Sequence, residues 1–333
     1  MSSKKEIVLN AFHNKPAERI PVGFWFHFLE PDQMNMGLDH PELMEKNLAG
    51  HRKFKEDFDP DFVKVMTDGL FFRPHNTLPV INCAADLRKI ENLDHNHPYF
   101  VKSIELAKNV REIFGDDTLI FFNIFAPLYH LTSLVNGSTD PSKVFEYLKE
   151  DPEAVEYALN KLGEDLSYLA EQILTEGKMD GLYLSVANPG RTIPAELYSK
   201  SVSPSETMIL DMGNKYSENH ILHICGYRGR QNILSVYRDY PVTVFNWAVH
   251  EEGMNLAEGK EYFHGKAVIG GFDQMPGSLI NAGKKEDIEA YVEKLITEGG
   301  KVGVIIGADC TVPSDTPIEN LKWVRDKAAE LSK

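Results

Sequence analysis

The stretch HILHICG, residues 220–226, places a thiol two residues after an imidazole. His223 and Cys225 end an apolar run in a chain that has only three cysteines. Side chains alternate between the two faces of a strand, so these two point the same way. Cys310, in VIIGADCTVPSDTP, directly follows another apolar run. One imidazole and two thiolates form a ligand set that zinc prefers, and three protein ligands leave a fourth position open.

A plainer interpretation of His223 and Cys225 is a polar pair buried at a strand end, without metal. Cys310 favours the metal interpretation because, in a barrel, the ends of both strands open onto the same mouth. Zinc held there could take a substrate sulfur or oxygen as its next ligand and lower its pKa. Cys83, in INCAADL, has no polar partner nearby and is expected to be a small core residue.

Short β-rich runs alternate with long amphipathic segments along the whole chain. The candidate strands are 20–28, 62–67, 118–125, 181–187, 220–225, 242–249, 267–272 and 302–308. Most are apolar nearly throughout, which is typical of parallel strands covered on both faces. The pattern predicts an α/β protein, a single-domain (β/α)8 TIM barrel over 1–333, with a doubly wound open sheet as the main rival. No Gly-rich phosphate loop follows a strand, which weakens a nucleotide-binding form of that rival.

The segments between these strands have the apolar spacing of helices. The clearest are 42–58, 152–177 and 286–300. A further helix is expected at the N-terminus, before the first strand. Thr316 is expected to cap a last helix opened by Pro317. The connection 68–117 is too long for a loop and one helix, so it predicts an insertion near the barrel mouth.

Composition excludes several classes of function. The chain has 333 residues and a formal net charge of −15, which argues against nucleic acid and against an anionic membrane surface as partners. No run approaches the roughly 18 apolar residues of a spanning helix. The first residues lack an apolar signal core, and three cysteines make no disulfide framework. We therefore expect a cytoplasmic protein.

The segments LHICG and GADCTVPSDTPIENL resemble the uroporphyrinogen decarboxylase superfamily, most closely its zinc-containing branch of corrinoid-dependent methyltransferases. Other similar segments span nearly the whole chain: ERIPVGFWFHF, DFVKVMTDGLFF, GKMDGLYLS, VFNWAV, LAEGKEYFHGKAVIGGFD and TPIENLKWV. The resemblance implies a (β/α)8 barrel with zinc on His223, Cys225 and Cys310. It also implies methyl transfer to or from a cobalamin held by a separate corrinoid protein. Zinc would activate a small substrate, either a thiol acceptor or a methyl donor such as an aryl methyl ether.

Two alternatives to a zinc-dependent methyltransferase remain open, and departures from the superfamily pattern bear on the first of them. True uroporphyrinogen decarboxylases carry arginines after the R-x-P-V segment to bind substrate carboxylates, but this chain has none between Arg19 and Arg52. This departure argues against metal-free decarboxylation, the first alternative, which calls for a cluster of basic side chains in the pocket. A zinc-stabilised binding module is the second, although it calls for four ligands and three are evident. The chain has no Asp-x-His-x-x-Gly signature of cobalamin binding, so the corrinoid is expected from a partner protein.

Further polar residues stand at other predicted strand ends. His27 follows the aromatic run of the first strand and shares a face with Trp25. Asn246 and Trp247 end the sixth strand, and His250 follows closely. Such residues suit an apolar pocket with a few directing groups.

Two carboxylates and an arginine complete the predicted rim. Asp273 follows the seventh strand, and it or Asp309 could reach the metal as a fourth ligand. Arg191, in NPGRTIP, is expected to meet an anionic ligand, and Asp68 stands where the superfamily often has an aspartate. Superfamily resemblance also suggests a homodimer. We predict catalytic roles for Asp68, His27, Asn246 and Asp273, and cofactor contacts for Trp247 and Arg191.

Overall fold

The computed structural model describes residues 2–67, 69–73, 80–226 and 229–332. Eight parallel strands follow one another around the sheet in the order β1-β8-β7-β6-β5-β4-β3-β2. They are β1 (Val22–Gly23), β2 (Phe62–Val65), β3 (Leu119–Phe125), β4 (Gly181–Val186), β5 (Ile221–Ile224), β6 (Val244–Trp247), β7 (Ala267–Phe272) and β8 (Val304–Ala308). The predicted (β/α)8 barrel is confirmed, and all eight candidate strands contain a strand.

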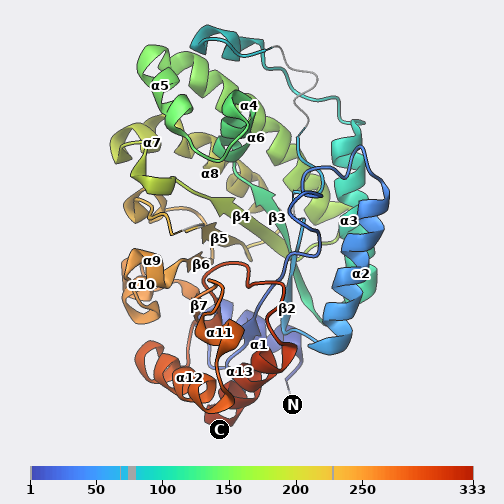
Figure 1. The fold of residues 1–333 in the computed structure, drawn as a ribbon, viewed down its shortest axis with the longest axis vertical. Helices are drawn as coiled ribbons and strands as arrows, with labels where there is room; N and C mark the ends of the chain where they lie inside the picture. The colour runs from blue at the N-terminus through green and yellow to red at the C-terminus, as the bar shows by residue number, and fades with distance from the viewer. Residues whose placement is uncertain (1, 68, 74–79, 227–228, 333) are drawn as a thin grey trace.

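Helices surround the strands, and both chain ends lie at the lower end of the molecule (Figure 1). They are α1 (Lys4–Phe12), α2 (Glu42–Asp57), α3 (Pro98–Phe114), α4 (Pro127–Asn136), α5 (Ser142–Glu150), α6 (Pro152–Thr175), α7 (Ala195–Ser201), α8 (Ser203–Gly213), α9 (Val249–Glu252), α10 (Leu256–Tyr262), α11 (Leu279–Ala282), α12 (Lys285–Gly299) and α13 (Ile318–Leu331). Short 3-10 turns are η1 (Ala84–Lys89), η2 (Pro189–Arg191) and η3 (Leu234–Tyr237). Within the described ranges, no helix combines the length and the apolar character needed to traverse a bilayer.

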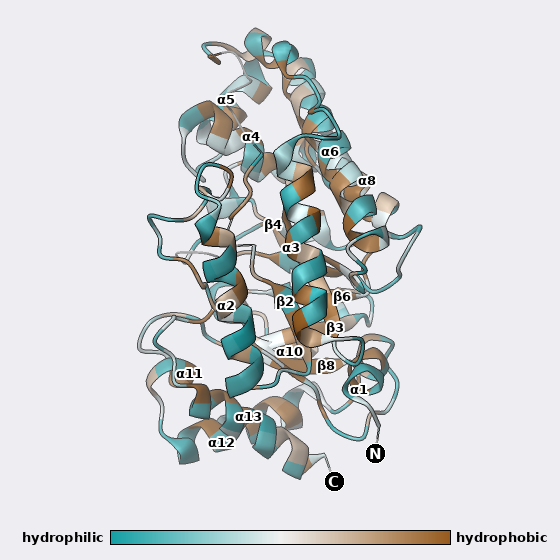
Figure 2. Ribbon diagram, turned by 90° about the vertical axis from the view of Figure 1, so that its right-hand side faces the viewer, coloured by the Kyte–Doolittle hydropathy of each residue, from teal (hydrophilic) through white to brown (hydrophobic). Residues whose placement is uncertain are grey.

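Two apolar layers hold the barrel together. The inner layer fills the barrel with strand residues such as Phe121 and Ile305. Val8 and Phe12 of α1 join this layer and cover the N-terminal end of the barrel. The outer layer packs the opposite faces of the strands against the ring of helices. The solvent side of α2 is accordingly hydrophilic (Figure 2). A packed interior leaves the C-terminal strand ends as the place for a site.

The seam between β1 and β2 is joined by a side chain. Asp61, 1% exposed, accepts hydrogen bonds from the Val22 amide at 2.8 Å and from Arg19 at 2.6 and 2.5 Å. A Cβ on Gly23 would lie 2.2 Å from the Phe62 ring, so glycine permits the close approach of the two strands. The barrel is thus nearly closed, although β1 has only two residues.

The bounds of three predicted features need correction. Of the predicted strand 20–28, only β1 pairs as a ladder, because pairing stops after Gly23 and resumes only as a single bridge from Phe26 to Val312. Thr316 is not the cap of α13, since extended Pro317 precedes the first helical residue. Cys83 is exposed rather than in the core, because it stands at the start of η1.

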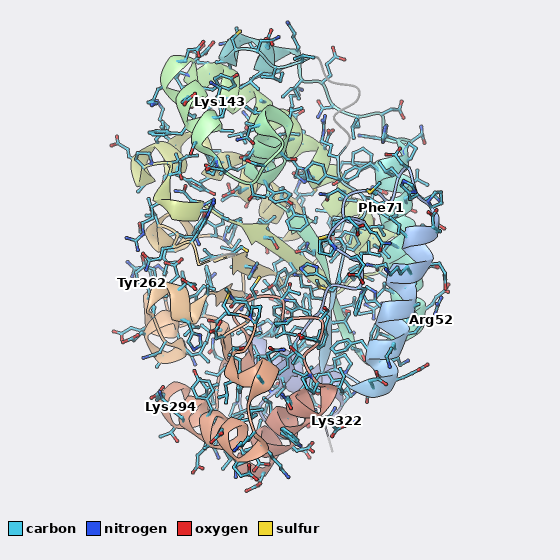
Figure 3. All side chains as sticks on the ribbon, viewed as in Figure 1. Arg52, Phe71, Lys143, Tyr262, Lys294 and Lys322 are labelled. Atoms are coloured by element: carbon cyan, nitrogen blue, oxygen red, sulfur yellow. The ribbon has the colours of Figure 1, made fainter. Side chains whose placement is uncertain are left out.

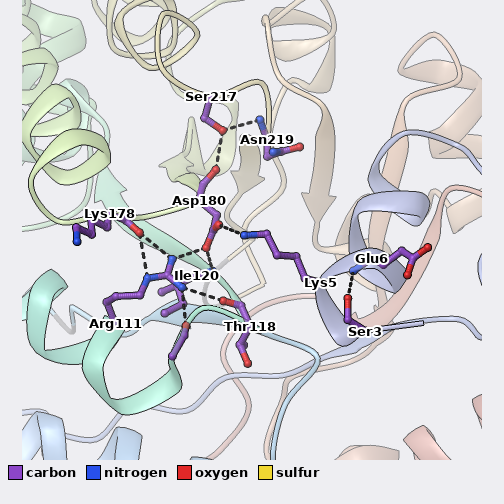
Figure 4. Close-up of polar contacts among 11 residues, drawn as sticks. Ser3, Lys5, Glu6, Arg111, Thr118, Ile120, Lys178, Asp180, Ser217 and Asn219 are labelled. Carbon is purple, nitrogen blue, oxygen red and sulfur yellow. Dashed lines mark hydrogen bonds and ion pairs between the residues drawn. The ribbon is translucent and has the colours of Figure 1, made fainter. Parts of the chain in front are cut away.

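One carboxylate joins several elements at the N-terminal ends of the barrel strands. Asp180, just before β4, accepts hydrogen bonds from Arg111, from Lys5 at 3.3 Å and from the Ile120 amide at 2.9 Å (Figure 4). These bonds link α1, α3 and β3. Because the N-terminal ends of barrel strands serve stability, this cluster is a structural clasp and not a site.

Surface charge is carried by the outer helices. Lys143, Lys294 and Lys322, labelled in Figure 3, lie on α5, α12 and α13, and each pairs with a glutamate of its own helix. Such exposed pairs contribute about 0–1 kcal/mol each. These three ion pairs belong to outer helices and not to the strand ends where a site is expected.

A buried acid network lies outside the barrel, between α7, α8 and η3. Glu206, 0% exposed, accepts hydrogen bonds from Tyr198 at 2.9 Å and from Tyr240 at 2.5 Å, and Tyr237 donates to Tyr198 at 3.0 Å. Burial raises the pKa of Glu206 to about 7, although the two tyrosine hydrogen bonds oppose the shift. Between the unfolded pKa near 4.5 and about pH 7, the Glu206 carboxyl is therefore protonated in the folded chain and ionised in the unfolded chain.

We expect Glu206→Gln to remove a pH-dependent loss of stability. A raised folded-state pKa carries no penalty below the unfolded value near 4.5, and the penalty grows as pH rises to about 7. It reaches roughly 3 kcal/mol at neutral pH. Urea unfolding at pH 4.5 and pH 8 measures it as the difference between wild type and variant. Glu218→Gln, on a side chain that is 79% exposed, is the control. The same pH dependence in wild type and Glu206→Gln would contradict the assignment.

Candidate metal centre

The three predicted ligands meet at the barrel mouth. His223 belongs to β5, Cys225 follows that strand, and Cys310 follows β8. The Cys310 Sγ lies 3.5 Å from His223 Nε2 and 4.0 Å from the Cys225 Sγ, and all three ligand atoms lie within 4.8 Å of one another. In the described part of the chain, no other three His, Cys, Asp or Glu side chains come together in this way.

The spacing of these atoms fits a tetrahedral zinc ion. Two Zn–S bonds of about 2.3 Å at the tetrahedral angle place the sulfurs about 3.8 Å apart, and a Zn–N bond of about 2.0 Å places nitrogen and sulfur about 3.5 Å apart. The observed separations are 4.0 and 3.5 Å. Cys310 is 9% exposed and Cys225 is partly exposed, so a fourth ligand can approach from the mouth. The donor set therefore matches an open, catalytic type of zinc site.

The electrostatics favour thiolates at this position. Hydrogen bonding to Cys225, and the nearness of His223 and Lys64, lower the pKa of the Cys310 thiol well below its ordinary value, although burial opposes them. Thiolates are the form in which cysteine binds metal. The surroundings of Cys310 therefore favour the deprotonated form of the thiol that a metal ion requires.

Asn246 fixes the orientation of the histidine ring. Its Oδ1 lies 2.5 Å from His223 Nδ1 and accepts from the Tyr183 hydroxyl at 2.8 Å, while its Nδ2 donates to the carbonyls of Ile269 and Ala308. An amide oxygen accepts only, so Nδ1 carries the proton and Nε2 is left for the metal. Register explains the contact, because Asn246 pairs with His223 across β5 and β6.

We expect Asn246→Ala to weaken zinc binding about 10- to 100-fold, because partners of this kind orient ligands and raise their basicity. Competition with a chromogenic chelator measures the affinity. Tyr183→Phe is the matched control, since it removes the other donor to the same oxygen and leaves the bond to His223. Equal loss in both variants, or no loss in Asn246→Ala, would show that the amide does not act through the ring.

Two further side chains hold the backbone beside the cysteines. Asn232 donates to the Cys225 carbonyl at 3.0 Å, and it bonds Glu252 on α9. Asp309, 0% exposed, accepts from the Gly271 amide at 3.1 Å and from the His250 amide at 3.0 Å. Sequence analysis missed Asn232, since it lies in a loop without periodic pattern. Both residues position the loops that carry sulfur.

Asp309 and His250 form a pair on the outer rim. The Nδ1 of His250 lies 2.7 Å from Asp309 Oδ2, and its Nε2 lies 3.3 Å from the Tyr291 hydroxyl. The hydrogen bond to Asp309 raises the pKa of His250, while burial raises the pKa of Asp309. Both oxygens of Asp309 are thus engaged by β7 and α9.

The other predicted site residues are spread more widely. His27 is exposed beyond β1, and Asp273 is partly buried with its Oδ1 bonded to the Met275 amide. Arg191 is exposed in η2, where its Nε donates to the Asn232 carbonyl. Asp68 lies outside the described residues. The functional roles given to these residues stay predictions.

Trp247 and Lys64 occupy opposite faces of the barrel wall. Trp247 is 0% exposed, donates to the Met254 carbonyl and packs on Phe263, among the outer core residues. It faces the helices, so the cofactor contact predicted for it has no support from its position. Lys64, which sequence analysis did not select, is 7% exposed on β2 and faces inward. A cation inside the apolar run FVKVMT was the available signal.

The chain is similar in sequence to one known family and in structure to several known proteins. The sequence profile described as uroporphyrinogen decarboxylase (URO-D) matches residues 66–331. A methyltransferase from Methanosarcina mazei is similar in structure, with a TM-score of 0.71 and 18% identity over 100% of each chain. A B12-independent methionine synthase from Shewanella sp. W3-18-1 has a TM-score of 0.56 and 13% identity, over 94% of this chain and 97% of that one. A search of curated proteins finds no match. The chain belongs to the uroporphyrinogen decarboxylase family.

Proposed function

We propose that the chain is a zinc-dependent methyltransferase that moves a methyl group between a corrinoid protein and a small substrate. The observation that carries the proposal is the ligand group His223, Cys225 and Cys310, whose 3.5 and 4.0 Å separations suit a tetrahedral ion at an open mouth. Family membership and the name of the Methanosarcina mazei neighbour support it. The substrate is a thiol acceptor or a methyl donor such as an aryl methyl ether.

The chain's own residues prepare the site. When bound, zinc supplies Lewis acidity that lowers the pKa of a substrate sulfur or oxygen. Asn246 keeps the proton of His223 on Nδ1. Asn232 and Asp309 hold the two backbone segments that carry the cysteines. This preorganisation lets the substrate enter a site whose ligands are already in place.

The thiol version of the reaction would break the cobalt–carbon bond of the methylated corrinoid, form a carbon–sulfur bond, and release the thiol proton and the reduced corrinoid, which keeps the electron pair. The ether version would break a carbon–oxygen bond and form the cobalt–carbon bond on the reduced corrinoid, and the departing oxygen would take up a proton to give the alcohol or phenol. The chain has no signature of cobalamin binding, so the corrinoid belongs to a partner that docks at the barrel mouth.

The alternatives have less support from the residues. Arg19 is paired with Asp61 at the β1–β2 seam, and no arginine follows before Arg52, so the start of the chain offers no cluster for a polycarboxylate. The partly exposed Cys225 disfavours a closed structural zinc site. The second structural neighbour is described as B12-independent, which makes corrinoid dependence the point to test.

The experiment is methyl transfer from methylcobalamin to small thiols, and from aryl methyl ethers to reduced cobalamin, followed by the cobalamin absorption spectrum. Zinc-loaded protein is expected to accelerate one of these reactions, and protein stripped with a chelator is not. Uroporphyrinogen is assayed in parallel for decarboxylation. Zinc-loaded protein that transfers no methyl group in either direction would contradict the proposal.

A further inference from the structure

Polar side chains lie inside the barrel next to the candidate metal centre. Phe121 of β3 and Tyr183 of β4 belong to the inner apolar layer. Side chains two residues further along a strand face the same way, so Asn123 and Ser185 also point into the barrel, nearer its mouth. Ser185 pairs in register with His223 on β5. Neighbouring strands lie about 4.8 Å apart, so this serine stands directly beside a proposed metal ligand.

Hydrogen bonds join these side chains to one another. The Ser185 hydroxyl donates to Asn123 Oδ1 at 2.7 Å, and Asn123 Nδ2 donates to the hydroxyl of Thr67, just beyond β2, at 3.2 Å. Asn123 is 4% exposed and Ser185 is 8% exposed. Thr67, Asn123 and Ser185, which we call the polar row, thus cross three neighbouring strands and end beside His223.

The polar row has hydrogen-bonding capacity that it does not use. A side-chain amide nitrogen has two protons to donate, and a hydroxyl has one proton and two lone pairs. Among the residues that the structure describes, one proton of Asn123 Nδ2 and the hydroxyl proton of Thr67 have no acceptor, and the Ser185 oxygen accepts no hydrogen bond. A buried network that is only partly satisfied is costly, so a further partner at this place would stabilise it.

Space for such a partner borders the polar row. A cavity of about 20 Å³ touches Thr67 and Asn123, and the rings of Phe71 and Phe125 also border it. This volume holds a group about the size of one water molecule. Within the described ranges, no Asp, Glu, Lys or Arg side chain lines the cavity. Neutral donors and acceptors beside apolar rings suit an uncharged polar group better than an ion.

We propose that the polar row binds an uncharged polar group of the substrate, such as a hydroxyl, while the reacting sulfur or oxygen lies at the metal. The proposal rests on the zinc site of the proposed function and narrows its substrate class to molecules with a hydroxyl or amide a few bonds from the reacting atom. The separation of about 4.8 Å between neighbouring strands matches a link of two or three carbons. A hydroxyl both donates and accepts, so it can use the Ser185 oxygen together with the unused protons of Asn123 or Thr67.

The test compares two thiols of nearly equal size on cobalt-substituted protein, whose Co²⁺ absorption spectrum reports a bound thiolate. 2-Mercaptoethanol carries a hydroxyl where 1-propanethiol carries a methyl group. Both are titrated into wild type, Ser185→Ala and the nearly isosteric Thr67→Val. We expect each variant to bind 2-mercaptoethanol about 3- to 10-fold more weakly, the effect of one hydrogen bond, and 1-propanethiol with unchanged affinity. Ser205→Ala is the matched control, because it removes a buried hydroxyl of α8 that bonds the Val202 carbonyl, and it should change neither affinity.

The two thiols together separate substrate binding from a structural role. If the polar row only stabilises the barrel wall, the variants weaken both thiols equally or neither, and either result overturns the proposal. Wild-type protein that holds cobalt but binds neither thiol also overturns it. Cobalt binding persists in these cases, so the proposed zinc site stands. Wild-type protein that takes up no cobalt or zinc overturns both proposals together.

Discussion

We expect Cys310→Ser to abolish both the zinc binding and the methyl transfer that we propose for this chain. Serine matches cysteine closely in size, but a neutral hydroxyl is a poor zinc ligand, and only His223 and Cys225 remain. We expect zinc affinity to fall on the order of 10³-fold and the bound metal to fall from about one ion per chain to nearly none. Metal analysis after dialysis against a weak chelator measures the loss, and circular dichroism verifies the fold.

The chain contains its own control for this substitution. Cys83 is exposed at the start of η1, so Cys83→Ser removes a thiol of the same chain without touching the barrel mouth. It should keep both zinc and activity. A Cys310→Ser protein with a full zinc complement would show that the three residues are only a polar cluster, and the metal-free alternative would then lead.

Asp165→Asn is expected to lower the free energy of unfolding by about 3–5 kcal/mol, because it leaves a buried guanidinium without its counter-ion. The Arg73 side chain is 0% exposed and that of Asp165, on α6, 3%. Asp165 accepts from Arg73 Nε at 2.8 Å and from the Leu93 amide at 3.2 Å, so it ties the long β2–β3 connection to the helix ring. Urea denaturation measures the change.

An exposed pair provides the comparison. Glu146→Gln breaks the Lys143–Glu146 contact, whose side chains are 44% and 57% exposed, and should cost less than about 1 kcal/mol. Replacement of both members of the buried pair by Met and Leu should recover part of the loss, because no charge is then buried alone. A loss below about 1 kcal/mol in Asp165→Asn would show that water reaches the pair.

Much of the barrel was predictable because its strands are apolar on both faces. The runs that became β3 to β8 stand out for that reason, and the Cys310 position after the last of them followed from the chain order. Strand ends were less predictable. The face assigned to His27 assumed a continuous strand through residue 28, whereas the ladder ends at Gly23 and only Phe26 bridges again, to Val312.

The candidate metal site was predictable only in its proposed ligands. His223 and Cys225 were recognisable by residue type and spacing, but Asn246 was selected as a catalytic candidate and is found as the partner of the histidine ring. Its neighbour Trp247 turns to the helices, as alternation along a strand requires. Cys83 was misplaced because residues near it have no periodic pattern from which burial can be inferred.

The wide sequence separation of the ligands has a consequence for biosynthesis. Cys225 and Cys310 are 85 residues apart, and the second follows the last strand of the barrel. A chain emerging from the ribosome presents its N-terminal residues first, so β5 is available long before the final sulfur. Until then the nascent chain has only two of the three proposed ligands, His223 and Cys225. In the proposed zinc enzyme, metal loading is therefore expected to be a late event that coincides with closure of the barrel.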